Sequence, residues 1–398
     1  MKKIVNALIR RIFWIVFFFF PVNKKRVLFS SFYGRGYGDN LKYICNELKD
    51  EKLDFGWVVN DDLEAKTLPK YVKPIYKNTI NLIFYLATSK VWIDNCRKSF
   101  VYKKKSQFYI QTWHGGGAQK KCEADAIEKI GKEYIKCAIK DSKYIDVMIS
   151  ESRFMTNLYH SSFWYDGPVY ECGYPRYDIL LEQHNKVRYK VHDFYHINYE
   201  TKMLLYAPTF RNNNLVNAYN IDLKRLQHNL EKRFKNNFVI LVHLHPNIAN
   251  KDTNIVYYGT NIINCTFYPD TQELLSECDF LIGDYSSINY DFCIRQLPVV
   301  RYVNDLKSYN LDRGTYFDFS EYPFPYATDN EELERIILNF DNDKYLINLN
   351  NFFNRIGSIN EYGASKKVSN LVLDCIHMKN NNKVLEKYKS VFIYKEEK

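Results

Sequence analysis

The residue best suited to proton transfer in this chain is a histidine that follows a short apolar run. His114 lies in YIQTWHGGG, residues 109–117, directly before three glycines. An imidazole accepts a proton near neutral pH, as a general base must. Glycine has no Cβ, so the backbone N–H groups of Gly115 and Gly116 can approach a ligand closely. The motif predicts a base beside an anion-binding turn, and a packed structural histidine is the alternative.

A second motif combines a carboxylate with two hydroxyls. It reads GDYSSINYDF, residues 283–292, and contains Asp284, Ser286 and Ser287 at the expected end of a strand. We expect Ser286 to cap a helix that begins at Ser287, where free N–H groups and the positive end of the helix dipole attract an anion. Two hydroxyls at such a helix end suit a diphosphate. An ordinary helix cap is the alternative interpretation.

A third motif, LVHLHPN at residues 241–247, carries two histidines in alternation. Side chains repeat every two residues in a strand, so His243 and His245 should point the same way. Pro246 should end the strand and leave His245 at its carboxyl end, facing a cleft. His243 is the one of the two that we expect to be a core histidine. Without further ligands nearby, the pair does not predict a zinc site.

Two arginines lie in polar loops where each could bind a phosphate with both ends of its guanidinium. Arg211 follows Thr209 in YAPTFR, and Arg313 precedes a glycine in LDRGTYFDF. A surface salt bridge would use either arginine equally well. The two loops therefore stay candidates for donor binding.

A glycine-rich loop, GRGYG at residues 34–38, follows the first expected strand. Its spacing departs from the dinucleotide-binding fingerprint, so it does not indicate NAD. Gly34 and Gly36 could instead let the backbone approach a phosphorylated acceptor or a lipid head group. A plain turn between strand and helix is the alternative.

The elements that must position these residues alternate between strand and helix from residue 26 onward. Continuous apolar runs bounded by turns are typical of parallel strands buried on both faces. We expect strands at 27–32, 55–60, 90–95, 107–113, 144–150, 203–208, 238–245, 278–284 and 297–302. We expect helices near 40–50, 78–88, 122–142, 222–235, 287–296, 331–340 and 363–378.

The alternation predicts two Rossmann-like domains. The polar stretch 181–200 interrupts it, so we place the boundary near 190, with an N-terminal acceptor domain at 26–190 and a C-terminal donor domain at 191–398. Two open α/β domains place a ligand in the cleft between the carboxyl ends of their strands. The expected fold class is therefore α/β with two such domains and a cleft.

The net charge limits the kinds of partner to expect, and the cysteine pattern indicates the redox compartment. The formal net charge is +10, which favours anionic partners such as phosphorylated small molecules or acidic lipids. No RNP, zinc-finger or helix-turn-helix pattern occurs, so nucleic acid is not an expected partner. The nine cysteines form no C-x-x-C pair and no zinc-like cluster, which is typical of a reducing compartment.

The N-terminal segment, residues 1–25, contains the apolar run IFWIVFFFFPV at 12–22 between basic residues. A bilayer span needs about 20 residues, so this run is too short to cross without including Arg10 and Arg11. Flanking lysines and arginines would hold it against an anionic leaflet. We expect a peripheral, monotopic anchor on the cytoplasmic face of the cell membrane. A short transmembrane anchor and a buried helix are the alternatives.

Taken together, the motifs resemble the CDP-glycerol glycerophosphotransferase family, whose members build teichoic acids and related capsule polymers. The resemblance runs from about residue 26 to 375 and includes FSSFYGRGYGDN, QTWHGG, DSKYIDVMISES, FWYDGPVYECGYPRYDIL, YAPTFR, DYSSINYDF, RGTYFDF and EYGASKKV. It implies a GT-B-like fold, peripheral membrane attachment and a CDP-linked polyol phosphate donor. The implied acceptor is a lipid-linked glycan or a growing polyol-phosphate chain.

The resemblance also implies roles for individual residues. His114 matches the histidine taken as general base, and His245 matches a histidine near the donor phosphates. The turn with Asp284, Ser286 and Ser287 matches the nucleotide–diphosphate site, and Arg313 matches an arginine–glycine motif beside it.

These features predict transfer of glycerol phosphate from CDP-glycerol to an acceptor hydroxyl with release of CMP. Phosphoryl transfer depends mostly on positioning and electrostatics, which fits the expected histidines, helix end and arginines. No cofactor or bound metal is expected, although Mg²⁺ could screen the donor. The alternatives are a CDP-ribitol donor, a nucleotide-sugar glycosyltransferase and a non-catalytic protein that binds an anionic polymer.

Overall fold

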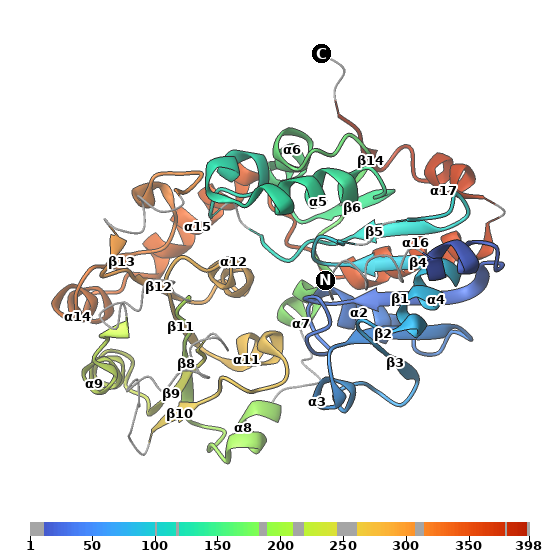
Figure 1. Ribbon diagram of the computed structural model, residues 1–398. Helices are drawn as coiled ribbons and strands as arrows, with labels where there is room; N and C mark the ends of the chain where they lie inside the picture. Colours follow the sequence, from blue (N-terminus) through green and yellow to red (C-terminus); the bar gives the residue numbers. More distant parts are fainter. Residues whose placement is uncertain are drawn as a thin grey trace. The chain divides into compact units, whose positions relative to one another are not determined.

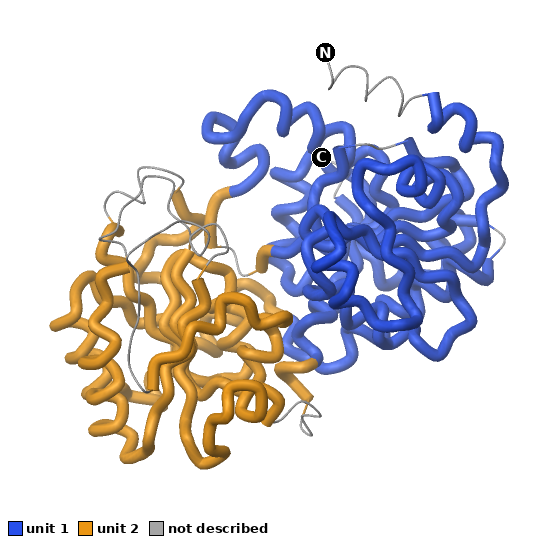
Figure 2. Tube along the Cα trace, turned by 60° about the horizontal axis from the view of Figure 1, so that its bottom comes forward, with its two compact units in different colours: residues 1–114, 122–178, 359–398 blue, residues 115–121, 179–358 orange. Residues whose placement is uncertain are grey.

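The chain forms two compact units, each with its own parallel sheet (Figure 2). The computed structural model describes residues 12–99, 102–116, 119–182, 189–209, 219–244, 261–306, 314–378 and 380–395. Unit 1 contains Met1–His114, Cys122–Asp178 and Ile359–Lys398. Unit 2 contains Gly115–Lys121 and Ile179–Ser358. The expected α/β class with parallel sheets is confirmed.

The sheet of unit 1 has the strand order β14-β7-β6-β5-β4-β1-β2-β3, and only β14 runs antiparallel to its neighbour (Figure 1). Its central strand β4 is buried along its whole length, as the apolar run predicted. The largest buried side chains of this sheet include Trp57 and Trp92. The strands are β1 Asn23–Ser30, β2 Asp54–Val59, β3 Val72–Tyr76, β4 Ser89–Asp94, β5 Phe108–Gln111, β6 Val147–Ser150, β7 Val169–Glu171 and β14 Phe392–Ile393.

The helices of unit 1 pack on this sheet and on one another, with α16 against α2, β4 and β1, and α6 against β6 and β7 (Figure 1). The helices are α2 Asp39–Glu47, α3 Asp62–Ala65, α4 Ile80–Thr88, α5 Lys132–Ser142, α6 Arg153–Ser162, α16 Ala364–His377 and α17 Asn381–Lys387, with the 3₁₀ turns η1 Glu123–Lys129 and η2 Pro175–Tyr177. The expected continuous helix over 122–142 is wrong, because η1 and α5 are separated at Gly131, which caps α5.

The C-terminal helices belong to unit 1, which differs from the expected division at residue 190. Asp178 explains the return of the chain, because its carboxylate accepts the N–H groups of Gly363, Ala364 and Ser365 at 2.8–3.1 Å. These N–H groups at the start of α16 have no hydrogen-bond partner within the helix, and a carboxylate at this position also complements the helix dipole. The chain crosses between units at Asp178, twelve residues before the expected boundary, and again at Ile359.

The sheet of unit 2 has the order β10-β9-β8-β11-β12-β13, with every pair parallel. Its inner strands are short and buried, and they are apolar except for the buried Arg301 of the strand at Val299–Tyr302. The strands are β8 Lys202–Tyr206, β9 Phe238–Val242, β10 Ile262–Asn264, β11 Phe280–Gly283, β12 Val299–Tyr302 and β13 Tyr326–Ala327. The helices are α8 Lys190–Tyr195, α9 Leu223–Phe234, α11 Thr271–Glu277, α12 Ile288–Cys293, α14 Asn330–Leu338 and α15 Asn342–Ile356, with α7 Asp178–Leu181 at the crossing and the 3₁₀ turn η4 Phe319–Glu321.

The start of the described chain is a short helix at residues 12–18. Its Trp14 is buried against Tyr102, and Phe17 packs edge-on against Phe84 of α4. Over the residues that the structure describes, no helix has the length and hydropathy needed to cross a membrane.

Candidate functional site

His114 lies at the carboxyl edge of the unit 1 sheet, three residues after β5 ends, and is half-buried. Its Nδ1 lies 2.6 Å from the backbone oxygen of Asn95. A carbonyl oxygen only accepts hydrogen bonds, so Nδ1 carries the proton and Nε2 is the basic nitrogen. The ring also packs against Trp113 and Phe32, at centroid distances of 4.6 and 5.4 Å. This is the tautomer and the fixed orientation that a general base needs.

The surroundings of His114 keep it neutral. Burial lowers the pKa of the imidazole, and the positive charge of Arg176 acts in the same direction. The bond to Asn95 and the negative charges of Asp39 and Glu123 oppose this shift without reversing it. The ring therefore stays in its basic form at neutral pH, ready to accept a proton.

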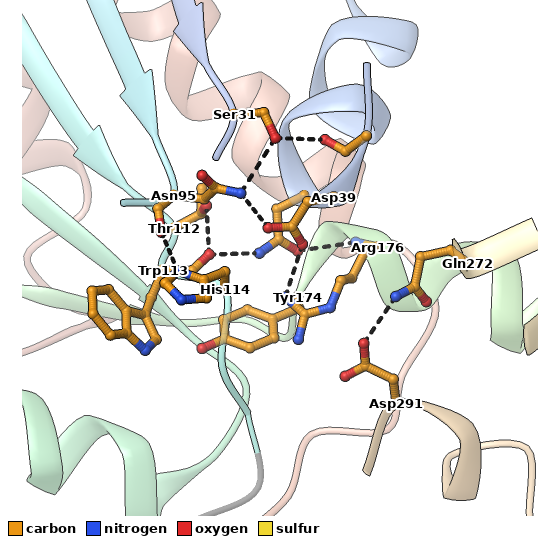
Figure 3. Close-up of polar contacts among 12 residues, drawn as sticks. Ser31, Asp39, Asn95, Thr112, Trp113, His114, Tyr174, Arg176, Gln272 and Asp291 are labelled. Atoms are coloured by element: carbon orange, nitrogen blue, oxygen red, sulfur yellow. Dashed lines mark hydrogen bonds and ion pairs between the residues drawn. The ribbon is translucent and has the colours of Figure 1, made fainter. Parts of the chain in front are cut away.

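A buried polar network holds this edge in place (Figure 3). The Asn95 amide donates to Asp39 and accepts the N–H of Phe32 at 2.8 Å. Asp39 also accepts from Arg176 at 3.0 Å, with both side chains almost fully buried. Asn40 donates to the Trp113 carbonyl at 3.2 Å. The network thus fixes Trp113, which directly precedes His114, and Asn95, whose backbone oxygen binds the imidazole.

Sequence reasoning missed this network. Asp39 and Asn40 end the motif FSSFYGRGYGDN, but no role followed from their types. Asn95 and Arg176 lie in other segments, and only the fold brings them together. A buried carboxylate needs a cation or several donors, so an Asp-Asn pair directly after a glycine loop was the available signal.

The backbone around His114 is strained. Phe32, Tyr33, Asp39 and Trp113 have left-handed φ angles of 42°, 60°, 57° and 55°. For residues other than glycine this conformation costs free energy, and it concentrates at active sites and ligand clamps. Two of these residues flank the glycine loop and one precedes His114. The strain supports the assignment of this edge as a functional site.

The two glycines predicted near the acceptor serve the turn after β1. Gly34 and Gly36 have φ angles of 94° and 69°, which favour glycine. A Cβ on Gly34 would lie 3.2 Å from Asn60 and Val59 atoms. The turn interpretation therefore accounts for both residues, and ligand contact stays a prediction. Gly115 and Gly116 start the short segment that belongs to unit 2.

That segment pairs with residues 314–316 of the predicted RGTYFDF loop. Lys121 donates its N–H to the Gly314 oxygen at 3.3 Å, and Lys120 forms a β-bridge with Thr315. The Gln119 oxygen accepts from the N–H of Tyr316 at 3.2 Å. Two motifs that are distant in sequence are thus hydrogen-bonded within unit 2.

In unit 2, the carboxyl ends of neighbouring strands β8 and β11 bring Thr209 and Asp284 together. The Asp284 carboxylate accepts the Thr209 N–H at 2.8 Å and its hydroxyl at 2.9 Å. Asp284 is buried. Its carboxylate therefore fixes the loop that follows β8, where Thr209 was predicted to bind a donor.

The serine turn differs slightly from expectation. The helix α12 begins at Ile288, one residue later than expected, and Ser287 before it has helical φ and ψ angles of −66° and −11° and makes no side-chain cap, so the capping hydroxyl is that of Ser286, as predicted. The Ser286 hydroxyl accepts the N–H of Ile288 at 3.3 Å. Dipolar attraction at so short a helix is modest, and the donor role of this turn stays a prediction.

Replacing Gly283 with alanine should destabilise unit 2. An added Cβ would lie 1.9 Å from Oδ1 of Asn289, whose amide donates to the Asp284 oxygen at 3.0 Å. Overpacking of this kind typically costs about 1–3 kcal/mol. Chemical denaturation of Gly283→Ala would measure the loss. The same substitution in an Asn289→Ala background is the control, because all three atoms nearest the added Cβ belong to Asn289, and an equal cost of Gly283→Ala in both backgrounds would contradict the interpretation.

Three predicted site residues, Arg211, His245 and Arg313, lie outside the described residues. His243 is described and half-buried, and its two ring nitrogens lie 3.2 Å from the Cys265 oxygen and 3.4 Å from the Thr271 hydroxyl. It has the contacts of a structural histidine, as expected. Within the described ranges, no group of three or more His, Cys, Asp or Glu side chains could hold a metal ion.

Comparison with known proteins identifies one family model and several relatives that are described as teichoic acid polymerases. The model of the CDP-Glycerol:Poly(glycerophosphate) glycerophosphotransferase family matches residues 12–374. A teichoic acid poly(glycerol phosphate) polymerase of Bacillus spizizenii is 28% identical over 381 residues, which cover 91% of this chain and 96% of that protein. A teichoic acid poly(ribitol-phosphate) polymerase of the same species is 25% identical, over 81% of this chain and 52% of that protein.

A solved structure of the wall teichoic acid polymerase TagF, a histidine variant soaked with CDPG, has a TM-score of 0.81 and 26% identity. The match covers 94% of this chain and 96% of that one. The fold of this chain is therefore GT-B-like, as in TagF.

Proposed function

The chain belongs to the CDP-glycerol:poly(glycerophosphate) glycerophosphotransferase family, and we propose that it transfers glycerol phosphate from CDP-glycerol to a hydroxyl of a membrane-linked glycan or polyol-phosphate chain. The product would be a teichoic acid or capsule polymer, and CMP would be released. The observation that carries this proposal is His114, whose Nδ1–H is bound to the Asn95 oxygen at 2.6 Å. That bond leaves Nε2 as the nitrogen that can take a hydroxyl proton.

In the proposed reaction, the acceptor oxygen attacks the β-phosphorus of CDP-glycerol while its proton passes to Nε2 of His114. The bond from that phosphorus to the bridging oxygen breaks, and its electrons leave with CMP. A new phosphodiester joins acceptor and glycerol. Charge builds up on the leaving phosphate, where we place His245, Arg211 and Arg313 together with the loop after β8 and the serine turn.

The donor site in unit 2 is supported by the contact between Thr209 and Asp284. This contact fixes the backbone directly before Arg211, at the strand end where α/β folds bind ligands. That the reaction needs no bound metal stays a prediction, although Mg²⁺ could screen the charge of the donor. Transfer of glycerol phosphate that persists in EDTA would support the prediction that no metal is required.

A CDP-ribitol donor is the second candidate, because a ribitol-phosphate polymerase is among the relatives. A nucleotide-sugar donor would require attack at carbon instead of phosphorus. A binding protein without catalysis would not need His114 in its basic form. The chemistry of the leaving group separates these cases.

Nucleotide release from purified protein should therefore identify the reaction. CDP-glycerol, CDP-ribitol and UDP-sugars would each be supplied with membrane extract as acceptor. We expect CMP from CDP-glycerol, and CMP from CDP-ribitol alone would change the donor. UDP from a sugar would contradict phosphotransfer, and ligand binding without release of any nucleotide would favour the binding protein.

The finer localisation, peripheral binding to an anionic membrane surface on the cytoplasmic face, is also part of the proposal. The helix at residues 12–18 packs with one face on unit 1 and leaves Ile15 and Phe18 exposed at 60% and 49%, and Phe19 in the turn after it is 81% exposed. Lys104 donates to the oxygens of Phe17 and Phe20, which ties a basic segment to this aromatic patch. Apolar side chains beside lysines suit an anionic interface.

Co-sedimentation with vesicles tests this proposal. Phe19→Glu should weaken binding to phosphatidylglycerol-containing vesicles several-fold, because it places a negative charge at the interface. Phe267→Glu is the matched control, since Phe267 is 73% exposed in unit 2. Equal binding by both variants would contradict the assignment of the patch.

A further inference from the structure

Unit 1 contains a cavity of about 100 Å³ that the proposed reaction has not used. It opens at the carboxyl ends of β1, β2 and β4, beside the start of α4. Ligands of open α/β sheets bind at this edge. A cavity of this volume has room for several non-hydrogen atoms of a ligand, since a single water molecule takes up roughly 10–15 Å³ on the same measure.

One wall of the cavity is polar and buried. Ser30 and Asp94 end the paired strands β1 and β4, where the two residues lie side by side in register. Lys98 lies 2.8 Å from the same carboxylate, which is only 5% exposed. Burying an ion pair costs more than packing apolar residues there. A hydroxyl, a carboxylate and an ammonium in one cavity wall can bind the hydroxyls of a ligand.

Another part of the lining is aliphatic, beside the polar Asn78 and Thr79 at the start of α4. Val58 at the end of β2, with Ile83 and Leu86 of α4, is buried there, and Leu82 is half-buried. A ligand that fits both parts has hydroxyls on one side and C–H groups on the other. A polyol or a sugar has this character.

The charges favour a polyol that carries one phosphodiester. Lys77 lines the cavity and is exposed, and it donates to the Tyr33 oxygen at 3.2 Å. Arg97 also lines the cavity, but its charge is met outside the cavity by Glu123 at 3.0 Å and Asp141 at 3.5 Å. Lys77 and Lys98 against Asp94 leave one net positive charge, which matches a monoanionic phosphodiester.

The cavity lies next to His114 in the fold. Tyr33 lines it, and the neighbouring Phe32 packs against the His114 ring. Asp94 lines it, and the next residue, Asn95, binds His114 Nδ1. A ligand unit in this cavity would therefore continue toward the base.

We propose that this cavity binds the glycerol phosphate unit of the acceptor that adjoins the attacking hydroxyl. Asp94, Ser30 and Lys98 would bind its hydroxyl oxygens, and Lys77 its phosphodiester. The inference rests on the proposed function, because it takes unit 1 as the acceptor side. It makes a polyol-phosphate chain the acceptor, in preference to a neutral glycan.

The test uses a short synthetic glycerol phosphate oligomer and two variants of the full chain. Leu82→Phe fills the cavity from α4, and Lys77→Ala removes the charge at its mouth. Ile80→Phe and Lys73→Ala are the controls. Ile80 is exposed and lies on α4, as Leu82 does, Lys73 is exposed on β3, which ends just before Lys77, and neither lines the cavity. Calorimetry gives the oligomer Kd, and CMP release gives the KM for oligomer and donor.

We expect the oligomer Kd and KM to rise about tenfold in both test variants, a change of roughly 1.4 kcal/mol. The KM for CDP-glycerol and both controls should stay within about twofold. Unchanged oligomer Kd in both variants, no binding to the unaltered chain, or equal binding of a phosphate-free glycerol ether would overturn the proposal. Because calorimetry needs no turnover, oligomer binding that the variants weaken, without CMP release, would refute only the proposed reaction.

Discussion

Replacing His114 with alanine should lower the turnover of CDP-glycerol by about 10²–10⁴-fold, the usual contribution of a general base. The hydroxyl that attacks phosphorus must lose its proton, and the structure orients His114 for this task through the Asn95 oxygen. The donor KM should change little, because we place the donor phosphates in unit 2. CMP release from saturating CDP-glycerol would measure the loss.

The control for this variant is His160→Ala. His160 is also half-buried, its Nε2 lies 3.0 Å from the Gly167 oxygen, and burial lowers its pKa in the same way. It lies on α6, outside the site, so its replacement should leave turnover within about twofold. Near-normal turnover in a folded His114→Ala variant would contradict the base assignment.

The pH profile of the same enzyme should carry the signature of His114. Burial lowers the pKa of this imidazole below its ordinary value of about 6.5. The basic form therefore persists as the pH falls to that value, and kcat/KM should decrease only below it. His114→Ala should lose this acid limb. A limb that begins above pH 7 in the unaltered enzyme would contradict a neutral, buried base.

The sequence predicted the buried central strands but not every long element: α6 and α15, helices of 10 and 15 residues, were not expected, and α15 is rich in asparagine, a weak helix former. Strands such as β4, buried on both faces, follow directly from their continuous apolar runs. Of the missed strands, β7, β10, β13 and β14 have two or three residues, too few for periodicity, and in β3, VKPIY, a lysine and a proline interrupt the apolar run. The division at 190 was wrong for a different reason. The C-terminal helices return to unit 1 because Asp178 caps α16, and the residues in this contact lie more than 180 positions apart in the sequence.

The site could be predicted in part. His114 follows a strand and precedes glycines, and this pattern alone marked it. Thr209 and Asp284 were each predicted at strand ends, and the fold explains their contact by the pairing of β8 with β11. Asn95 and Arg176 could not be found this way, because their roles depend on left-handed backbone at Asp39 and on spatial proximity. Sequence patterns show the types of residues and their spacing along the chain. A network of buried side chains from distant segments can be recognised only once the fold is known.

Arg176→Met should cost about 3–5 kcal/mol of unfolding free energy, because it leaves the Asp39 carboxylate buried without its cation. The two groups lie 3.0 Å apart and are only 3% and 5% exposed. Chemical denaturation would measure the loss. The control is Arg153→Met, whose ion pair with Glu171 has a 56% exposed arginine. Such surface pairs are worth about 0–1 kcal/mol, so equal losses in both variants would contradict the prediction.

A second substitution separates charge from packing. Adding Asp39→Asn to Arg176→Met removes the unpaired carboxylate, and asparagine tolerates the left-handed backbone at this position. Most of the lost stability should return, whereas a loss caused by packing alone would remain. The positive charge of Arg176 also lowers the pKa of His114, and the negative charge of Asp39 raises it. The single variant should therefore move the acid limb of kcat/KM to higher pH, and the double variant should move it back. A limb that does not move would mean that the network supports the fold but does not tune the base.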